Sequence, residues 1–142
     1  MAVSVGMQGF FGLGVQPKRE LRSRLNLVAA AEAHILWKTR LGHHVHGNIR
    51  EPLESAPVGQ DGICQLGIWI NGPVFEPLRG SDAYQRIYDA HRQFHQMGDL
   101  IIEKLRTSDR GGAEKIFANE YTQSLHHLIQ SLVEINKILQ AD

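Results

Sequence analysis

The feature that most constrains the fold is a regular spacing of apolar residues near the end of the chain. Between residues 121 and 139 they recur at intervals of four, three, four, three and four: Tyr121, Leu125, Leu128, Leu132, Ile135 and Leu139. This spacing is typical of an α-helix that packs against other helices along one apolar stripe. Apolar and polar residues do not alternate with a period of two over any useful length. We therefore expect an all-α fold.

Two similar stripes predict two more long helices. The first helix begins at Pro17 and fades by Gly47, with a stripe made of Leu27, Ala30, His34, Trp37 and Leu41. The second follows Ser81 and Asp82, either of which can cap it, and its stripe includes Tyr84, Ile87 or Tyr88, His91, Phe94, Ile101 and Leu105. Gly111 and Gly112 predict a break before the last helix.

A shorter helix is predicted between the first two stripes. The segment GICQLGIWI can be capped by Asp61 and is stopped by Asn71, Gly72 and Pro73, while Pro52 and Pro57 mark a long loop before it. The prediction is a four-helix bundle over residues 17–142, built from three long helices and one short helix that carries Cys64. Residues 1–16, rich in glycine, are expected to be a flexible N-terminal arm.

Length and charge exclude several classes of protein. The 142 residues suit one domain, and 15 basic side chains balance 15 acidic ones, so no basic surface is expected to attract nucleic acid. No apolar run approaches the roughly 18–20 residues that cross a bilayer. Cys64 is the single cysteine and cannot form an internal disulfide. A reducing interior, the cytoplasm, is the expected location.

Three histidines lie on or beside the predicted apolar stripes, and each needs a partner for its ring nitrogens if it is buried. For His34 alone, a hydrogen bond to a carbonyl or a carboxylate would suffice. His91 and His95, four residues apart, share one helix face. Together with Cys64, the three histidines make a set of one sulfur and three nitrogens, which suits tetrahedral Zn²⁺.

Three segments carry a resemblance to a known family. AHILWK (33–38), CQLGIW (64–69) and AHRQFH (90–95) resemble, in that order, the chemoreceptor zinc-binding (CZB) domains, over roughly residues 20–105. The resemblance implies that His34, Cys64, His91 and His95 hold one Zn²⁺. It also implies that Gly67 allows the short helix to pack closely, and that Trp37 and Trp69 form walls of the site. Ala33 and Ile68 depart from the family pattern, so a supporting carboxylate is either missing or supplied by Glu32 or Asp89.

The resemblance also implies a function. Such domains are regulatory sensors that couple zinc occupancy or thiolate oxidation to bacterial signalling, in chemotaxis or cyclic-di-GMP synthesis. The expected partners are a second copy of the chain and a signalling protein, either a chemoreceptor or a diguanylate cyclase, in the same chain or another. Four protein ligands leave no open zinc position, and no catalytic motif is present, so we expect no enzyme activity.

Two other functions remain open from the sequence. A hemerythrin-like iron site would also sit in a helical bundle, but it needs about five histidines with bridging carboxylates. A metal-free bundle would serve as an interaction module. The cluster His43, His44 and His46 is a weaker metal candidate near a helix end, and His126 and His127 receive no role, although one of them could approach the core.

Overall fold

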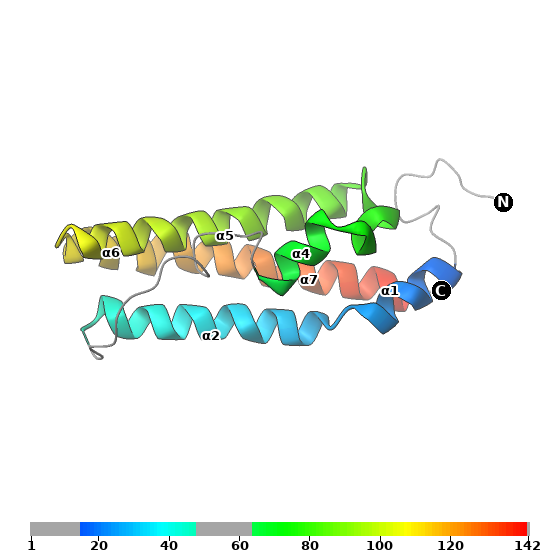
Figure 1. Ribbon diagram of the computed structural model, residues 1–142, viewed down its shortest axis with the longest axis horizontal. Helices are drawn as coiled ribbons and strands as arrows, with labels where there is room; N and C mark the ends of the chain where they lie inside the picture. Colours follow the sequence, from blue (N-terminus) through cyan, green and yellow to red (C-terminus); the bar gives the residue numbers. More distant parts are fainter. Residues whose placement is uncertain (1–14, 48–63, 142) are drawn as a thin grey trace.

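The computed structural model describes residues 15–47 and 64–141, and every regular element within them is helical (Figure 1). Three long helices form the body of the bundle: α2 (Leu27–Val45), α5 (Asp82–Arg106) and α7 (Thr122–Gln140). The shorter elements are α1 (Val15–Arg24), α4 (Gln65–Asn71), the 3₁₀ helix η2 (Pro73–Leu78), α6 (Arg110–Ile116) and the π turn η3 (Phe117–Tyr121). The all-α bundle is confirmed. The arm expected over residues 1–16 lies almost entirely outside the described residues and stays a prediction.

The apolar stripes face the core as their spacing predicts. On α7, Leu125, Leu128, Leu132, Ile135 and Leu139 are all buried. The stripes of α2 and α5 meet this face, and α5 and α7 make the most extensive contact between two elements. None of the described helices is long and apolar enough to cross a membrane.

The first predicted helix is in fact two helices. α1 ends at Arg24, and α2 begins at Leu27 after Asn26, whose side-chain oxygen accepts a hydrogen bond from the Ala29 N–H at 2.9 Å. This cap satisfies a backbone donor that a continuous helix would have bonded within itself. Asparagine is favoured at such a position, and the prediction of one helix from Pro17 overlooked this signal.

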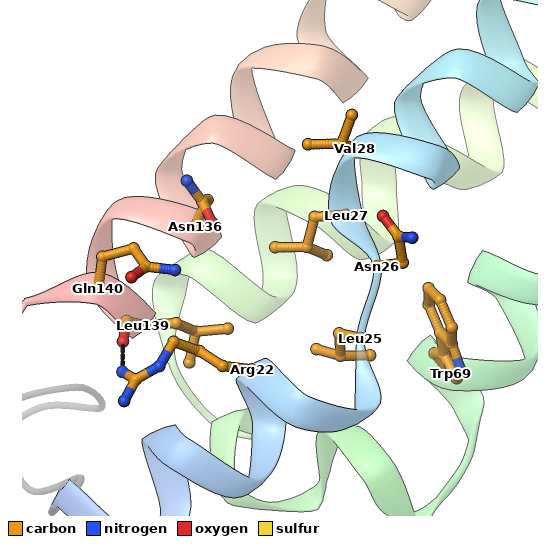
Figure 2. A pocket seen from close by; sticks show the side chains of 9 residues that line it. All are labelled: Arg22, Leu25, Asn26, Leu27, Val28, Trp69, Asn136, Leu139 and Gln140. Atoms are coloured by element: carbon orange, nitrogen blue, oxygen red, sulfur yellow. Dashed lines mark hydrogen bonds between the residues drawn. The ribbon is translucent and has the colours of Figure 1, made fainter.

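The break between α1 and α2 lets α1 reach the end of α7. Lys18 Nζ donates to the carbonyl of Ala141 at 2.9 Å. The Arg22 guanidinium donates to the carbonyl of Leu139 (Figure 2). Both carbonyls lie at the C-terminal end of α7, where cations are favourable. A cavity of about 430 Å³ lies at this junction, lined by residues that include Leu25, Asn26, Trp69, Asn136 and Gln140.

The break before the last helix also differs from the prediction. The chain turns at Thr107–Asp109, where Ser108 has a positive φ of 64°, and α6 begins at Arg110. Asp109 caps α6 by accepting the Gly112 N–H at 2.9 Å. A Cβ at Gly112 would lie 2.4 Å from the Asp109 carboxylate. Gly112 therefore lies inside α6, where the lack of a side chain lets the Asp109 carboxylate approach its N–H, and it does not interrupt the helix.

A π turn joins α6 to α7. The hydroxyl of Thr122, the first residue of α7, donates to the carbonyl of Phe117, the first residue of η3, at 2.7 Å. The turn places Tyr121 fully in the core, where its ring stacks on Phe94 with centroids 4.7 Å apart. Among the described residues, the Tyr121 hydroxyl has no hydrogen-bond partner. Burial raises the pKa of this hydroxyl above its usual range.

Candidate metal centre

Four potential metal ligands from three elements converge inside the bundle. His34 comes from α2, Cys64 precedes α4, and His91 and His95 come from α5. Their ligand atoms all lie within 4.8 Å of one another, and all four residues are buried. The four side chains that the sequence singled out are thus brought together at one place.

The spacing of the ligand atoms suits a single metal ion. The Cys64 Sγ lies 3.0 Å from Nε2 of His91, 3.6 Å from Nε2 of His95 and 3.8 Å from Nε2 of His34. The Nε2 atoms of His91 and His95 are 3.1 Å apart. Around a tetrahedral zinc, neighbouring ligand atoms would be about 3.3–3.6 Å apart, given the usual zinc–nitrogen and zinc–sulfur bond lengths. The donor set and its dimensions therefore fit Zn²⁺.

The orientation of His34 is fixed by its own helix. Its Nδ1 lies 2.7 Å from the carbonyl of Ala30, one turn earlier on α2. A carbonyl can only accept, so Nδ1 carries the proton and donates. The lone pair of the neutral ring is then on Nε2, the nitrogen that faces Cys64. This contact selects the tautomer that a metal requires, in the manner of the supporting hydrogen bonds found around zinc-bound histidines.

Cys64 is the N-cap of α4 rather than a residue within the short helix. Its backbone is extended, with φ −76° and ψ 157°, and its Sγ accepts the N–H of Gly67 at 3.3 Å. The expected helix start near Asp61 is corrected by this finding, because α4 begins at Gln65; Asp61 itself lies outside the described residues. Gly67 is buried, as close packing of the short helix would require.

Burial keeps His34 and His91 neutral. Loss of hydration lowers the pKa of His34 to about 4, against a smaller opposing effect of the Ala30 carbonyl and with a further lowering by His95. Loss of hydration, followed by repulsion from His95 and then His34, lowers the pKa of His91 to about 2. Both rings are therefore unprotonated near pH 7, the form in which imidazole binds a metal.

Two aromatic rings pack against the cluster. Trp37 lies against His34 and His95, with ring centroids 5.0 and 5.3 Å away, and Phe94 lies against the same two rings at 5.3 and 5.5 Å. Trp37 thus packs directly against two of the clustered histidines. Trp69 borders the cavity at the α1–α2 junction, and no ring contact between Trp69 and the cluster is found among the described residues (Figure 2).

Neither of the two candidate carboxylates is buried with the cluster. Glu32 and Asp89 are both exposed, and Asp89 accepts a hydrogen bond from Gln85 at 3.0 Å. The Ala30 carbonyl and the Gly67 N–H are the supporting groups that the structure adds. Neither could be predicted, because every residue carries such backbone groups and only the local geometry decides which are used.

The remaining histidines form no second metal site in the part of the chain that the structure describes. His43 and His46 are exposed and His44 is half-buried near the end of α2. His126 and His127 are both exposed on α7, so the suggestion that one approaches the core is wrong. The described metal cluster also contains no carboxylate, which the hemerythrin alternative requires.

Comparison with known proteins agrees with this geometry. Residues 34–102 match the family model described as the chemoreceptor zinc-binding domain, and the matched segment includes all four clustered side chains. No curated protein and no solved structure matched the chain in the same comparisons. Residues 34–102 therefore belong to the chemoreceptor zinc-binding domain family, and zinc is the cofactor of this chain.

Proposed function

We propose that His34, Cys64, His91 and His95 hold one Zn²⁺ and that the domain reports the state of this site to a signalling protein. The observation that carries the proposal is the convergence of four buried ligand atoms within 4.8 Å of one another. Three neutral imidazoles and one thiolate would place a single negative charge beside the ion. Bound zinc supplies the cation that makes a buried thiolate favourable.

A site with four protein ligands is suited to regulation rather than catalysis. No position remains at a tetrahedral zinc for water or substrate, so the domain is proposed to have no enzyme activity. The ligands instead connect α2, α4 and α5, and the packing of these elements depends on whether the site is complete.

The proposed signal starts at the thiolate of Cys64. Cys64 is the redox-active ligand of the cluster, and its oxidation would remove the charged donor. We propose that zinc occupancy or thiolate oxidation is read by a chemoreceptor or a diguanylate cyclase, with the domain acting as a homodimer. A reducing cytoplasm would keep the thiolate available as a ligand.

The first test is metal content, measured by mass spectrometry on protein purified without a histidine tag or a chelator. We expect about one zinc per chain in the wild type and loss of zinc in both Cys64→Ala and His91→Ala. His127→Ala is the matched control, because His127 is an exposed histidine on α7 and lies outside the cluster. A wild type that is empty and takes up no added zinc would rule the proposal out.

The sensory part is tested separately by oxidation. Stoichiometric hypochlorous acid should release zinc from the wild type, as measured with a coloured zinc indicator. A reductant should restore zinc binding as long as the Cys64 thiolate has been oxidised only to a reversible state. Full zinc affinity together with full oxidant response in Cys64→Ser would contradict this role of the thiolate.

A further inference from the structure

We propose that Arg79 and Tyr84 are positioning residues for the zinc site. They hold the C-terminal end of α4, and this fixes Cys64 at the other end of the same helix. The inference rests on the proposed zinc site and adds two residues for which no hydrogen bond or ring contact with the metal ligands is found among the described residues.

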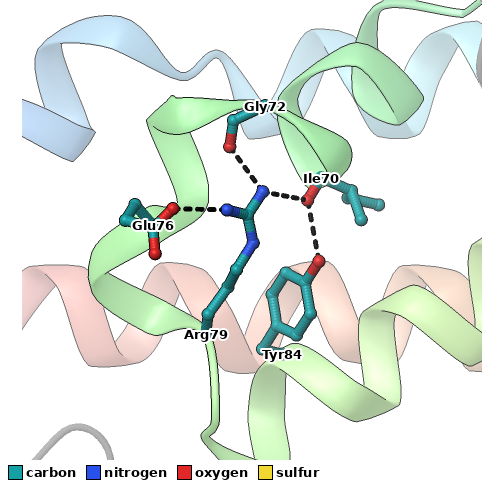
Figure 3. A network of polar contacts seen from close by, with 5 residues as sticks. All are labelled: Ile70, Gly72, Glu76, Arg79 and Tyr84. Atoms are coloured by element: carbon teal, nitrogen blue, oxygen red, sulfur yellow. Dashed lines mark hydrogen bonds and ion pairs between the residues drawn. The ribbon is translucent and has the colours of Figure 1, made fainter.

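The contacts of the two side chains meet at the end of α4 (Figure 3). Tyr84, in the first turn of α5, donates its hydroxyl to the carbonyl of Ile70 at 2.9 Å. Arg79 Nη2 donates to the carbonyl of Gly72 at 2.7 Å and more weakly to that of Ile70 at 3.3 Å. Its Nη1 pairs with Glu76 at 2.5 Å. These donors satisfy carbonyls that the end of a helix leaves without partners.

α4 needs such support because it is very short. It has seven residues, about two turns, while isolated helices below roughly 12–15 residues are marginal in water. Leu66 and Ile70 bury one face of α4 in the core. Apolar burial is not directional, so these two side chains hold α4 against the bundle without fixing its position along its axis. Hydrogen bonds to defined carbonyls do fix that position.

The two ends of α4 are attached to matching points on α5. Cys64 meets His91 at one end, and Ile70 meets Tyr84 at the other. The six residue steps from Cys64 to Ile70 correspond to about 9 Å of helix, and the seven steps from Tyr84 to His91 correspond to about 10.5 Å. α4 therefore runs antiparallel to α5 between these attachments, and a shift at the Tyr84 end would be transmitted along a short rigid helix to the sulfur.

Zinc ligation is sensitive to such a shift. The zinc–sulfur bond is about 2.3 Å, with a tolerance of about 0.2 Å, so a modest slide of α4 would weaken the bond to Cys64. The histidines would be affected less, because His34, His91 and His95 belong to the long helices α2 and α5. Loss of the two positioning residues should thus affect the sulfur bond selectively.

The test uses Tyr84→Phe, which removes only the hydroxyl, and Arg79→Lys, which keeps the charge and loses the forked donor. The zinc affinity of each variant is measured by competition with a chelator. Tyr88→Phe is the control for the tyrosine, one turn further along α5. Arg86→Lys is the control for the arginine, since Arg86 pairs with Glu134 of α7 and not with α4.

We expect zinc affinity to fall by roughly 10- to 100-fold in Tyr84→Phe and Arg79→Lys, as for other supporting residues of metal sites, and to stay unchanged in the controls. Two readouts separate positioning from general loss of stability. The sulfur-to-metal charge-transfer band of the Co²⁺-loaded protein should weaken relative to the ligand-field bands. In metal-free protein, the buried Cys64 thiol should react faster with a thiol reagent.

Two results would overturn the inference: wild-type affinity, charge-transfer intensity and thiol reactivity in both variants, or reduced affinity with an unchanged charge-transfer band. Tyr84→Phe decides the matter alone if Arg79→Lys does not fold, as judged by circular dichroism of the metal-free protein. A wild type that binds no zinc would instead refute the zinc site itself, and with it this inference.

Discussion

His34 and His91 are bases held in the core in their neutral form, and this ties the stability of the metal-free protein to pH. Both pKa values lie below the ordinary 6.5, at about 4 and about 2, chiefly because burial removes hydration. Below pH 6.5 the unfolded chain therefore binds more protons than the folded chain, and the free energy of unfolding falls as the pH falls. Above pH 6.5 neither state gains protons at these groups, and the effect vanishes.

We expect metal-free protein to lose on the order of 3 kcal/mol through His34 alone between pH 6.5 and pH 4. The measurement is urea unfolding at several pH values in the presence of a chelator. His127→Ala, at an exposed histidine, should follow the same curve as the wild type. A free energy of unfolding that stays constant over this range would show that His34 and His91 are not buried as neutral rings.

At Tyr121 we expect a substitution to raise the free energy of unfolding. Its hydroxyl is buried without a hydrogen-bond partner among the described residues, and such a group carries an uncompensated loss of hydration. Tyr121→Phe should therefore raise the free energy of unfolding, by about 1 kcal/mol, while keeping the stack on Phe94. Chemical unfolding of the two proteins at pH 7 tests this. A clear loss of stability would mean that the hydroxyl has a partner.

At the level of the elements, the junction between α1 and α2 is set by one cap. Asn26→Ala removes the acceptor for the Ala29 N–H and should lower the free energy of unfolding by about 1 kcal/mol. Asn26→Ser, which can also cap, should recover most of the loss, and thermal unfolding followed by circular dichroism distinguishes the two. Equal stability of the alanine and serine variants would argue that the cap does not fix the junction.

The elements also show where sequence reasoning succeeds. The stripes of α2, α5 and α7 could be predicted because each long helix repeats its apolar spacing many times, so chance errors average out. The four clustered side chains could be predicted because three lie on or beside those stripes and the fourth is the single cysteine. Helix ends were harder to predict from the sequence, because each depends on a single capping residue such as Asn26, Cys64 or Asp109.

The contacts that support the metal ligands could not be predicted from the sequence, for a different reason. Arg79 and Tyr84 act on backbone carbonyls of α4, and the Ala30 carbonyl orients His34. Nothing in a sequence marks which carbonyl will be left open at a helix end. Glu32 and Asp89 were candidates because they lie near the ligands in the sequence, but both side chains are exposed.

For the whole molecule, zinc should act as a ligand that stabilises the folded state. A bound metal at about 1,000 times its dissociation constant adds about 4 kcal/mol to the free energy of unfolding. We therefore expect a strong chelator to lower the unfolding temperature of the wild type and to leave that of Cys64→Ala unchanged. An unchanged wild-type unfolding temperature would favour the metal-free interaction module.

The docking of α1 on the end of α7 has a consequence for how the protein is made. Lys18 and Arg22 bond to the carbonyls of Ala141 and Leu139, so their partners are among the last of the described residues to leave the ribosome. Translation proceeds at about 5–20 residues per second from the N-terminus, and all four clustered side chains are synthesised before α7 begins. On the nascent chain, the ligands are thus complete before the bundle can close.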